Sequence, residues 1–162
     1  MNEVKPLRRS VQLQPLSREH HDGLLFVWKI REGLKNNTSI DKLRDYTGWY
    51  WRHHIRPHFF QEEKILLKFI PAFHPLAVRL KEDHEYIREL ILSIDKDGER
   101  QDFIKLANLI ETHIRFEERE LIQYLEEELS DQYLAEIFME LEKHPLGQEE
   151  KWKDEFWLSK TN

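Results

Sequence analysis

The spacing of apolar residues along the chain predicts four amphipathic helices. Apolar side chains recur every three or four residues through four long stretches, a period that places them on one face of a helix. The stretches cover approximately residues 18–35, 41–70, 75–97 and 100–128. Pro57 lacks an amide proton and should kink the second helix. The lengths and the short connections favour an all-α fold, an antiparallel, up-down-up-down four-helix bundle.

The two ends of the chain lie outside this pattern. Two prolines interrupt residues 1–16, so we expect an extended N-terminal lead-in, with Ser17 as the N-cap of the first helix and the bundle over 17–129. Residues 130–162 should form a short fifth helix, capped by Ser130, and a C-terminal tail. We expect the tail to pack back on the bundle through its aromatic residues, Trp152, Phe156 and Trp157.

The composition restricts the class of protein. Lys and Arg number 25 against 31 Asp and Glu, a net charge of −6 that disfavours a nucleic-acid or anionic-membrane partner. The chain has no cysteine, which excludes disulfides, iron–sulfur clusters and thiolate zinc sites and makes a cytoplasmic location the simplest expectation. No apolar run approaches the roughly 18 residues of a transmembrane helix. We therefore expect a soluble monomer or homodimer.

Two of the predicted helices carry the same motif. The second reads His58-Phe-Phe-Gln-Glu62 and the fourth reads His113-Ile-Arg-Phe-Glu117, and in both a leucine follows the glutamate by four residues. Residues at i and i+4 lie one turn apart on the same face of a helix. The His and the Glu of each motif can therefore reach a common ion.

The first and third helices each add one inward histidine. His84 is followed by apolar residues three and seven positions later, and His21 reproduces that spacing with Leu24 and Trp28. The adjacent His20 remains an alternative, because only the phase of the helix separates the two. Four imidazoles and two carboxylates would then meet at the bundle centre, a ligand set suited to two iron or manganese ions bridged by the glutamates.

Buried histidines and glutamates also occur in proteins without a metal. A single histidine on an inner face is more often a core residue satisfied by hydrogen bonds. The carboxylates of Glu62 and Glu117 could also pair with Arg88 and Arg115. An unpaired carboxylate in an apolar core costs several kcal/mol, however, and a divalent metal removes that cost at both positions. Because the motif is repeated, we favour a metal site.

Three neighbouring residues have weaker assignments. His54 lies one turn before His58 and is either a fifth imidazole ligand or, as we prefer, a residue outside the ligand set. Glu63 and Glu118 directly follow the predicted glutamate ligands. They could accept hydrogen bonds from ligating histidines, but we expect ordinary surface charges.

Together these motifs resemble the hemerythrin family, in particular the bacterial hemerythrin-like (HHE cation-binding) domains. The resemblance covers residues 17–129, with a histidine on the first and third helices and His-x-x-x-Glu on the second and fourth. It implies a non-haem centre of two iron ions with an oxo or hydroxo bridge, with manganese or zinc as alternatives. It also implies six metal ligands: His21, His58, Glu62, His84, His113 and Glu117.

The sequence departs from the oxygen-carrying hemerythrins in two places. Arg88 stands where their third helix has a second histidine. Their fourth helix has an Asp five residues after its histidine, where this chain has Glu117 at four and Glu118 at five. The loss of one imidazole opens a coordination position, which suits reaction with O2, nitric oxide or peroxide at least as well as O2 storage.

The resemblance and these departures indicate a binding protein rather than a dedicated enzyme, and we assign no catalytic residue. We expect a di-iron protein that binds or senses O2, nitric oxide or reactive oxygen species, or that handles iron under oxidative or nitrosative stress. A di-iron oxidase or peroxidase is the first alternative. A metal-free helical bundle that acts as an interaction module is the second.

Overall fold

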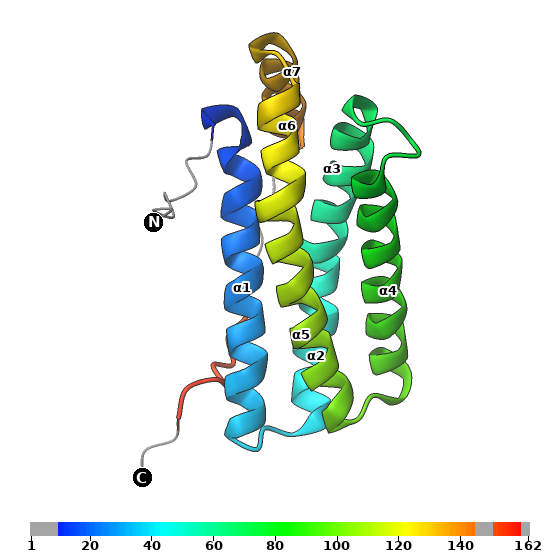
Figure 1. Cartoon of the computed structure of the whole chain (residues 1–162). Coiled ribbons are helices and arrows are strands. Elements are labelled where there is room, and N and C mark those ends of the chain that lie inside the picture. The colour runs from blue at the N-terminus through cyan, green and yellow to red at the C-terminus, as the bar shows by residue number, and fades with distance from the viewer. Residues whose placement is uncertain (1–9, 145–150, 160–162) are drawn as a thin grey trace, which may run out of the picture.

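The computed structural model describes residues 10–144 and 151–159, and every regular element within them is a helix. Four helical rods lie side by side (Figure 1). The first rod is α1 (Gln14–Lys35), preceded by the short 3₁₀ turn η1 (Val11–Leu13). The third rod is α4 (Pro75–Asp97). The structure thus has the all-α class that the apolar spacing predicts.

The second and fourth rods each contain a π-helical turn. The second rod consists of α2 (Ile40–Tyr50), the π turn η2 (Trp51–Ile55), α3 (Arg56–Ile65) and the 3₁₀ turn η3 (Leu66–Phe69). The fourth consists of α5 (Arg100–Phe116), the π turn η4 (Glu117–Leu121) and α6 (Ile122–Glu128). π turns are rare and concentrate at functional sites, so these two segments indicate where a functional site could lie.

The irregularity in the second rod lies next to Pro57, where a kink is predicted. At the end of η2 the amide of Arg56 donates to the carbonyl of Trp51, five residues back instead of four. Pro57 has no amide proton to donate, so the regular hydrogen-bond ladder cannot pass through it unchanged. The helix widens there and continues as α3.

The N-terminal boundary of the bundle differs from the prediction. α1 begins at Gln14, so residues 14–16 are helical rather than extended and Ser17 lies inside the helix instead of capping it. Leu13 and Leu16 are both buried in the core, and this burial accounts for the earlier start. Residues 11–13 of the predicted lead-in form the 3₁₀ turn η1, and residues 1–9 lie outside the described residues.

The C-terminal segment follows the prediction, with a further helix and an aromatic tail that packs on the bundle. Ser130 caps α7 (Asp131–Lys143) by accepting a hydrogen bond from a backbone amide. Phe156 and Trp157 are buried against the bundle, and Trp152 packs beside them. Residues 151–159 form turns and irregular chain.

The core consists of two apolar clusters separated by a polar layer. On α4, Leu80 belongs to one cluster, Ile87 belongs to the other, and the buried His84 lies between them. On α1, Leu16 and Phe26 lie in different clusters in the same way. The buried polar groups of such a layer need partners, because an unpaired polar group in a core is costly.

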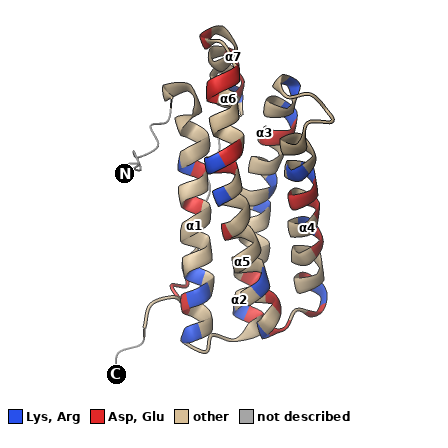
Figure 2. Ribbon diagram, in the orientation of Figure 1, with Lys and Arg blue, Asp and Glu red and all other residues tan. Residues whose placement is uncertain are grey.

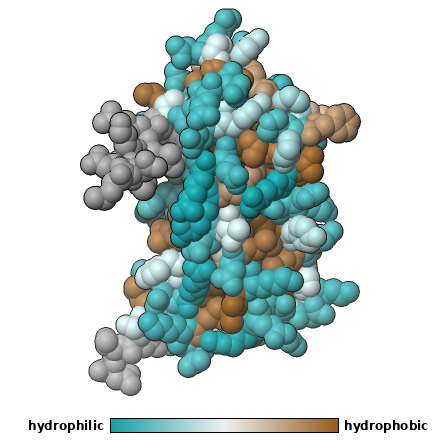
Figure 3. Space-filling model, viewed as in Figure 1, coloured by the Kyte–Doolittle hydropathy of each residue, from teal (hydrophilic) through white to brown (hydrophobic). Residues whose placement is uncertain are grey.

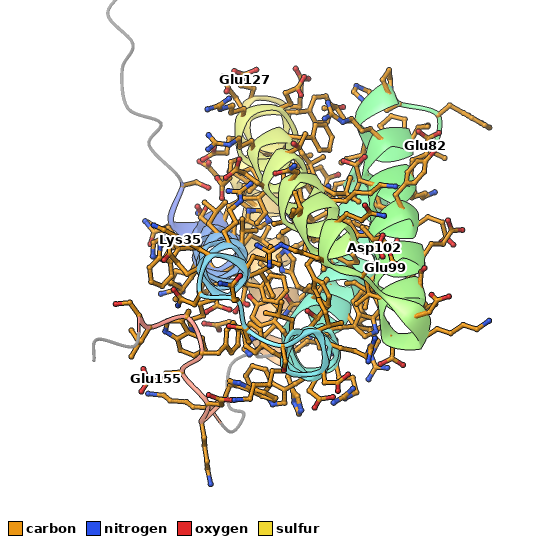
Figure 4. All side chains as sticks on the ribbon, turned by 90° about the horizontal axis from the view of Figure 1, so that it is seen from below. Lys35, Glu82, Glu99, Asp102, Glu127 and Glu155 are labelled. Atoms are coloured by element: carbon orange, nitrogen blue, oxygen red, sulfur yellow. The ribbon has the colours of Figure 1, made fainter. Side chains whose placement is uncertain are left out.

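Charged residues cover the outer faces of the rods. Lys, Arg, Asp and Glu occur along all four of them (Figure 2), and the face in view is largely hydrophilic with separate apolar patches (Figure 3). Seen along the bundle, Lys35, Glu82 and Glu127 lie at its periphery while other side chains fill the space between the rods (Figure 4). Within residues 10–144 and 151–159, no helix combines the length and apolar character needed to cross a membrane.

Candidate metal centre

Four histidines and two glutamates meet in the polar layer. Each of the four rods contributes at least one of them, and the second and fourth rods contribute the repeated His-x-x-x-Glu motif. All six are buried, with the following exposed fractions: His20 2%, His58 8%, Glu62 0%, His84 0%, His113 3% and Glu117 0%.

Glu117, the first residue of the π turn η4, contacts all four imidazoles. Its Oε1 lies 2.8 Å from Nε2 of His113 and 3.6 Å from Nε2 of His84. Its Oε2 contacts Nε2 of His20 and lies 3.9 Å from Nε2 of His58. One carboxylate therefore faces histidines from all four rods.

Glu62 on α3 occupies an equivalent position on the other side. Its Oε1 lies 3.2 Å from Nε2 of His58 and 3.3 Å from Nε2 of His84. Its Oε2 lies 3.7 Å from Nε2 of His20. All of these contacts are made by Nε2 atoms, so the four rings direct the same nitrogen toward the centre.

These inward atoms lie close together but do not form hydrogen bonds with one another. The Nε2 atoms of all four histidines and both oxygens of each glutamate are buried without a hydrogen-bond partner among the described residues. Buried polar groups are normally paired, and leaving so many unpaired is costly. Each of these atoms has a lone pair that it can give to a cation, so the donor set fits a bound metal.

The ligand atoms form two overlapping groups of four. One group takes His20 and His58 and the other takes His84 and His113, while the two glutamates belong to both. Within each group the ligand atoms lie within 4.8 Å of one another. Imidazole and carboxylate ligands without thiolate suit iron, manganese or zinc.

Three further carboxylates contact the outer nitrogens of the histidines. Through Nδ1, His20 contacts Glu118 at 2.8 Å, His113 contacts Asp83 at 2.9 Å and His84 contacts Glu63 at 3.3 Å. A proton on Nδ1 donated to a carboxylate leaves the Nε2 lone pair facing the centre, the tautomer that a metal requires. The expectation that Glu63 and Glu118 are ordinary surface charges is therefore wrong, and the sequence gives no signal for Asp83.

Burial and charge pairing act on the pKa values of the centre in opposite directions. Burial disfavours the charged form of His58, but the carboxylates of Glu62 and Glu117 together outweigh this effect and raise the pKa of His58 to about 9. Burial and the charge of Glu117 disfavour the ionised form of Glu62, yet its contacts with His58 and His20 lower its pKa. The centre thus combines ionised carboxylates with imidazoles that bind protons readily, so protons and metal ions compete for it.

A small cavity of about 40 Å³ borders the donor set. It exceeds the roughly 10–15 Å³ that a water molecule needs. Apolar side chains, including Ile87, Ile110 and Ile114, form much of its lining, and Tyr50 and His54 also line it. Four donor residues also border it: His20, His58, His113 and Glu117. A small ligand in this cavity would lie next to the metal ligands.

The histidine of α1 that joins the centre is His20, and the prediction of His21 is wrong. The side chain of His21 is exposed. The buried face of α1 runs through Leu16, one turn before His20, and through Val27, seven residues after it. The prediction used Trp28 to set the phase, but Trp28 is 47% exposed. Leu16 and Val27 were the signal that would have selected His20.

The residues considered as alternatives lie elsewhere. Nδ1 of His54 lies 3.7 Å from Oδ2 of Asp22, outside the donor set. Among the described residues, Arg88 pairs with Glu85 and Arg115 lies 3.8 Å from Glu111, so neither arginine neutralises the buried glutamates. Both pairs lie at the surface of their helices.

Comparison with known proteins supports the cation site. The family model for the hemerythrin HHE cation-binding domain matches residues 11–125, a segment that contains all six donor residues and most of the chain. No curated protein and no solved structure matches the chain. From the family match and the buried donor set together, we conclude that the chain belongs to the hemerythrin HHE cation-binding domain family.

Proposed function

We propose that the donor set binds two iron ions, with Glu62 and Glu117 shared between them. The observation that carries the proposal is the set of buried Nε2 and carboxylate oxygen atoms without hydrogen-bond partners, divided into two groups that share the glutamates. The proposal includes the up-down-up-down order of the rods. The arrangement in Figure 1, where successive connections lie at opposite ends of the bundle, supports that order.

Bound iron would supply the redox and ligand-binding chemistry of the site. Glu118, Asp83 and Glu63 favour one tautomer in three of the four imidazoles, those of His20, His113 and His84. The small apolar cavity lies on one side of the donor set. We therefore propose that the protein binds or senses O2, nitric oxide or reactive oxygen species, or handles iron under oxidative or nitrosative stress. We place this function in the cytoplasm, in a monomer or homodimer.

One observation favours a di-iron oxidase or peroxidase as the second candidate. Tyr50 and His54, two side chains that can donate or accept protons, line the cavity next to the donor set. Oxidation chemistry needs such a group beside the reacting molecule. In a protein that only binds a gas, these residues would serve binding and would not support turnover.

Metal content and the optical spectrum test the proposal. The purified protein would be loaded anaerobically with Fe(II), desalted, analysed for iron, and followed spectroscopically on exposure to O2, nitric oxide and peroxide. We expect two irons per chain and a near-ultraviolet charge-transfer band that bleaches on reduction. A stable adduct would support binding or sensing, whereas repeated consumption of O2 or peroxide with a reductant would support the oxidase or peroxidase.

A matched variant controls for loosely bound iron. Glu62→Ala should lose the spectrum, whereas Glu82→Ala, which removes a peripheral carboxylate of α4 (Figure 4), should keep it. Iron at trace level in the wild type, together with a melting temperature that neither iron nor a chelator changes, would contradict the proposal. That result would favour the metal-free interaction module.

A further inference from the structure

Two spaces next to the donor set share part of their lining, and we call this shared part the wall. The inner one is the cavity of about 40 Å³ that borders the metal ligands. The outer one is a groove of about 760 Å³ between α1, α2 and the C-terminal residues 151–157. Glu19, Tyr50 and His54 line both spaces, so these three side chains form the wall.

Of the three wall residues, Tyr50 is held in place by the most contacts. It is 5% exposed, and its ring stacks on Phe26 at 4.2 Å and on His54 at 4.6 Å between centroids. Its hydroxyl donates a hydrogen bond of 2.6 Å to Oδ2 of Asp22. The same carboxylate oxygen lies 3.7 Å from Nδ1 of His54. Asp22 therefore holds Tyr50 in place through a hydrogen bond and lies near His54.

The apolar core residues of the cavity lining offer no comparable path to the surface. Phe59, Ile87, Ile110 and Ile114 are at most 5% exposed and belong to the apolar cluster below the donor set. Moving any of them would disturb close-packed core. Glu19 and His54 are only partly buried, so the side of the cavity that faces the groove can open at less cost than this apolar side.

We propose that the groove is the access route to the centre for a small uncharged molecule, a diatomic gas, and that Tyr50 controls this route through its hydrogen bond to Asp22. The lining of isoleucines and Phe59 disfavours an anion, which would lose its hydration without gaining partners there. The identity of the ligand rests on the proposed function. The route itself rests only on the wall between the two spaces.

Tyr50→Phe tests the route because it keeps the ring and removes only the hydroxyl that bonds to Asp22. In the iron-loaded, reduced protein, the association rate of nitric oxide should rise about tenfold, the factor expected for one hydrogen bond to a charged group. The association rate of azide, a charged probe, should rise less. The control is Tyr124→Phe on α6, whose ring packs against His74 at 4.7 Å and lines neither space.

A second variant should act in the opposite direction. A Cβ added at Gly23, which also lines the inner cavity, would meet Cδ1 of Ile114 at 2.8 Å, and the end of that flexible side chain would have to move. Because Ile114 lines the cavity too, Gly23→Ala should leave less room there. We expect slower association of nitric oxide with unchanged iron content.

Xenon in the metal-free protein separates this proposal from the proposed function. Xenon enters apolar cavities, and its exchange is measurable by NMR without iron. Xenon exchange should accelerate in Tyr50→Phe and stay unchanged in Tyr124→Phe. If the wild type binds no iron but xenon exchange responds in this way, the metal function fails and the route stands. If xenon and nitric oxide rates are the same in Tyr50→Phe and wild type, the route is wrong.

Discussion

Nδ1 of His20 lies 2.8 Å from Oε1 of Glu118, and Nε2 of the same ring contacts Glu117, the preceding residue. Adjacent glutamates on one π turn thus hold opposite sides of one imidazole, one at the centre and one outside it. In this arrangement the outer carboxylate favours a proton on Nδ1, and the inner one lies beside Nε2 in the donor set. Asp83 holds His113 in the same manner from a different helix.

Removing an outer carboxylate should weaken metal binding without abolishing it. Glu118→Ala and Asp83→Ala each leave one ring free to rotate or change tautomer, and we expect the affinity for Fe(II) to fall about 10–100-fold. Titration against a competing chelator measures this change. Glu120→Ala, which removes an exposed carboxylate from the same π turn, is the control. Equal affinities for Glu118→Ala and Glu120→Ala would show that the His20–Glu118 contact has no role.

His20 and His21 provide a test of the helix phase. His20→Ala removes a buried donor and should remove most of the iron, whereas His21→Ala changes an exposed side chain and should leave both iron content and spectrum unchanged. Elemental analysis of the two variants after identical loading gives the answer. The reverse result would mean that α1 is rotated relative to the other rods.

Glu62 and Glu117 should be the most sensitive positions of the centre. Each belongs to both ligand groups, so Glu62→Ala or Glu117→Ala should affect both ions and lower the affinity by more than the outer carboxylates do. Glu63→Ala removes only a 3.3 Å contact to His84 and should have the smaller, outer-carboxylate effect. Iron per chain and the charge-transfer band measure the difference. Similar losses in Glu62→Ala and Glu63→Ala would argue against shared glutamate ligands.

The metal-free and metal-loaded proteins should respond to pH in opposite ways. The pKa of His58 is raised from 6.5 to about 9 in the folded protein, so the stability that its charged form contributes is fully present below pH 6.5 and is lost as the pH rises through about 9. The chelated protein should therefore melt at progressively lower temperature across that interval. In the loaded protein, protons and metal compete, so its stabilisation by metal should increase with pH. His58→Gln should flatten the curve of melting temperature against pH in the chelated protein. An unchanged curve would show that another group causes the pH dependence.

The C-terminal tail should contribute to the stability of the bundle. Trp157 is 9% exposed, and Lys29 lies over its ring at 4.2 Å from the centroid. Trp157→Ala should lower the free energy of unfolding by about 3–5 kcal/mol. Leu158→Ala, at a neighbouring residue that is 53% exposed, should change it little. Chemical denaturation measures both, and equal effects would contradict the packing of the tail.

The sequence predicted the helices and five of the six residues that form the buried donor set. Apolar periodicity located the four rods, and the spacing within His58–Glu62 and His113–Glu117 placed each pair on one helical face. These features are local, because the geometry of one helix fixes which residues share a face. The resemblance to the hemerythrin family rested on the same local motifs.

The packing of the helices against one another selects the neighbouring groups that complete the centre. His20 and His21 differ by one helical step, and the packing of α1 through Leu16 determined which of them faces inward. The contact between His113 and Asp83 joins two helices across 30 residues, and no sequence period encodes it. Periodicity describes one helix at a time, whereas the choice of ligand and of outer carboxylate depends on how helices pack against one another.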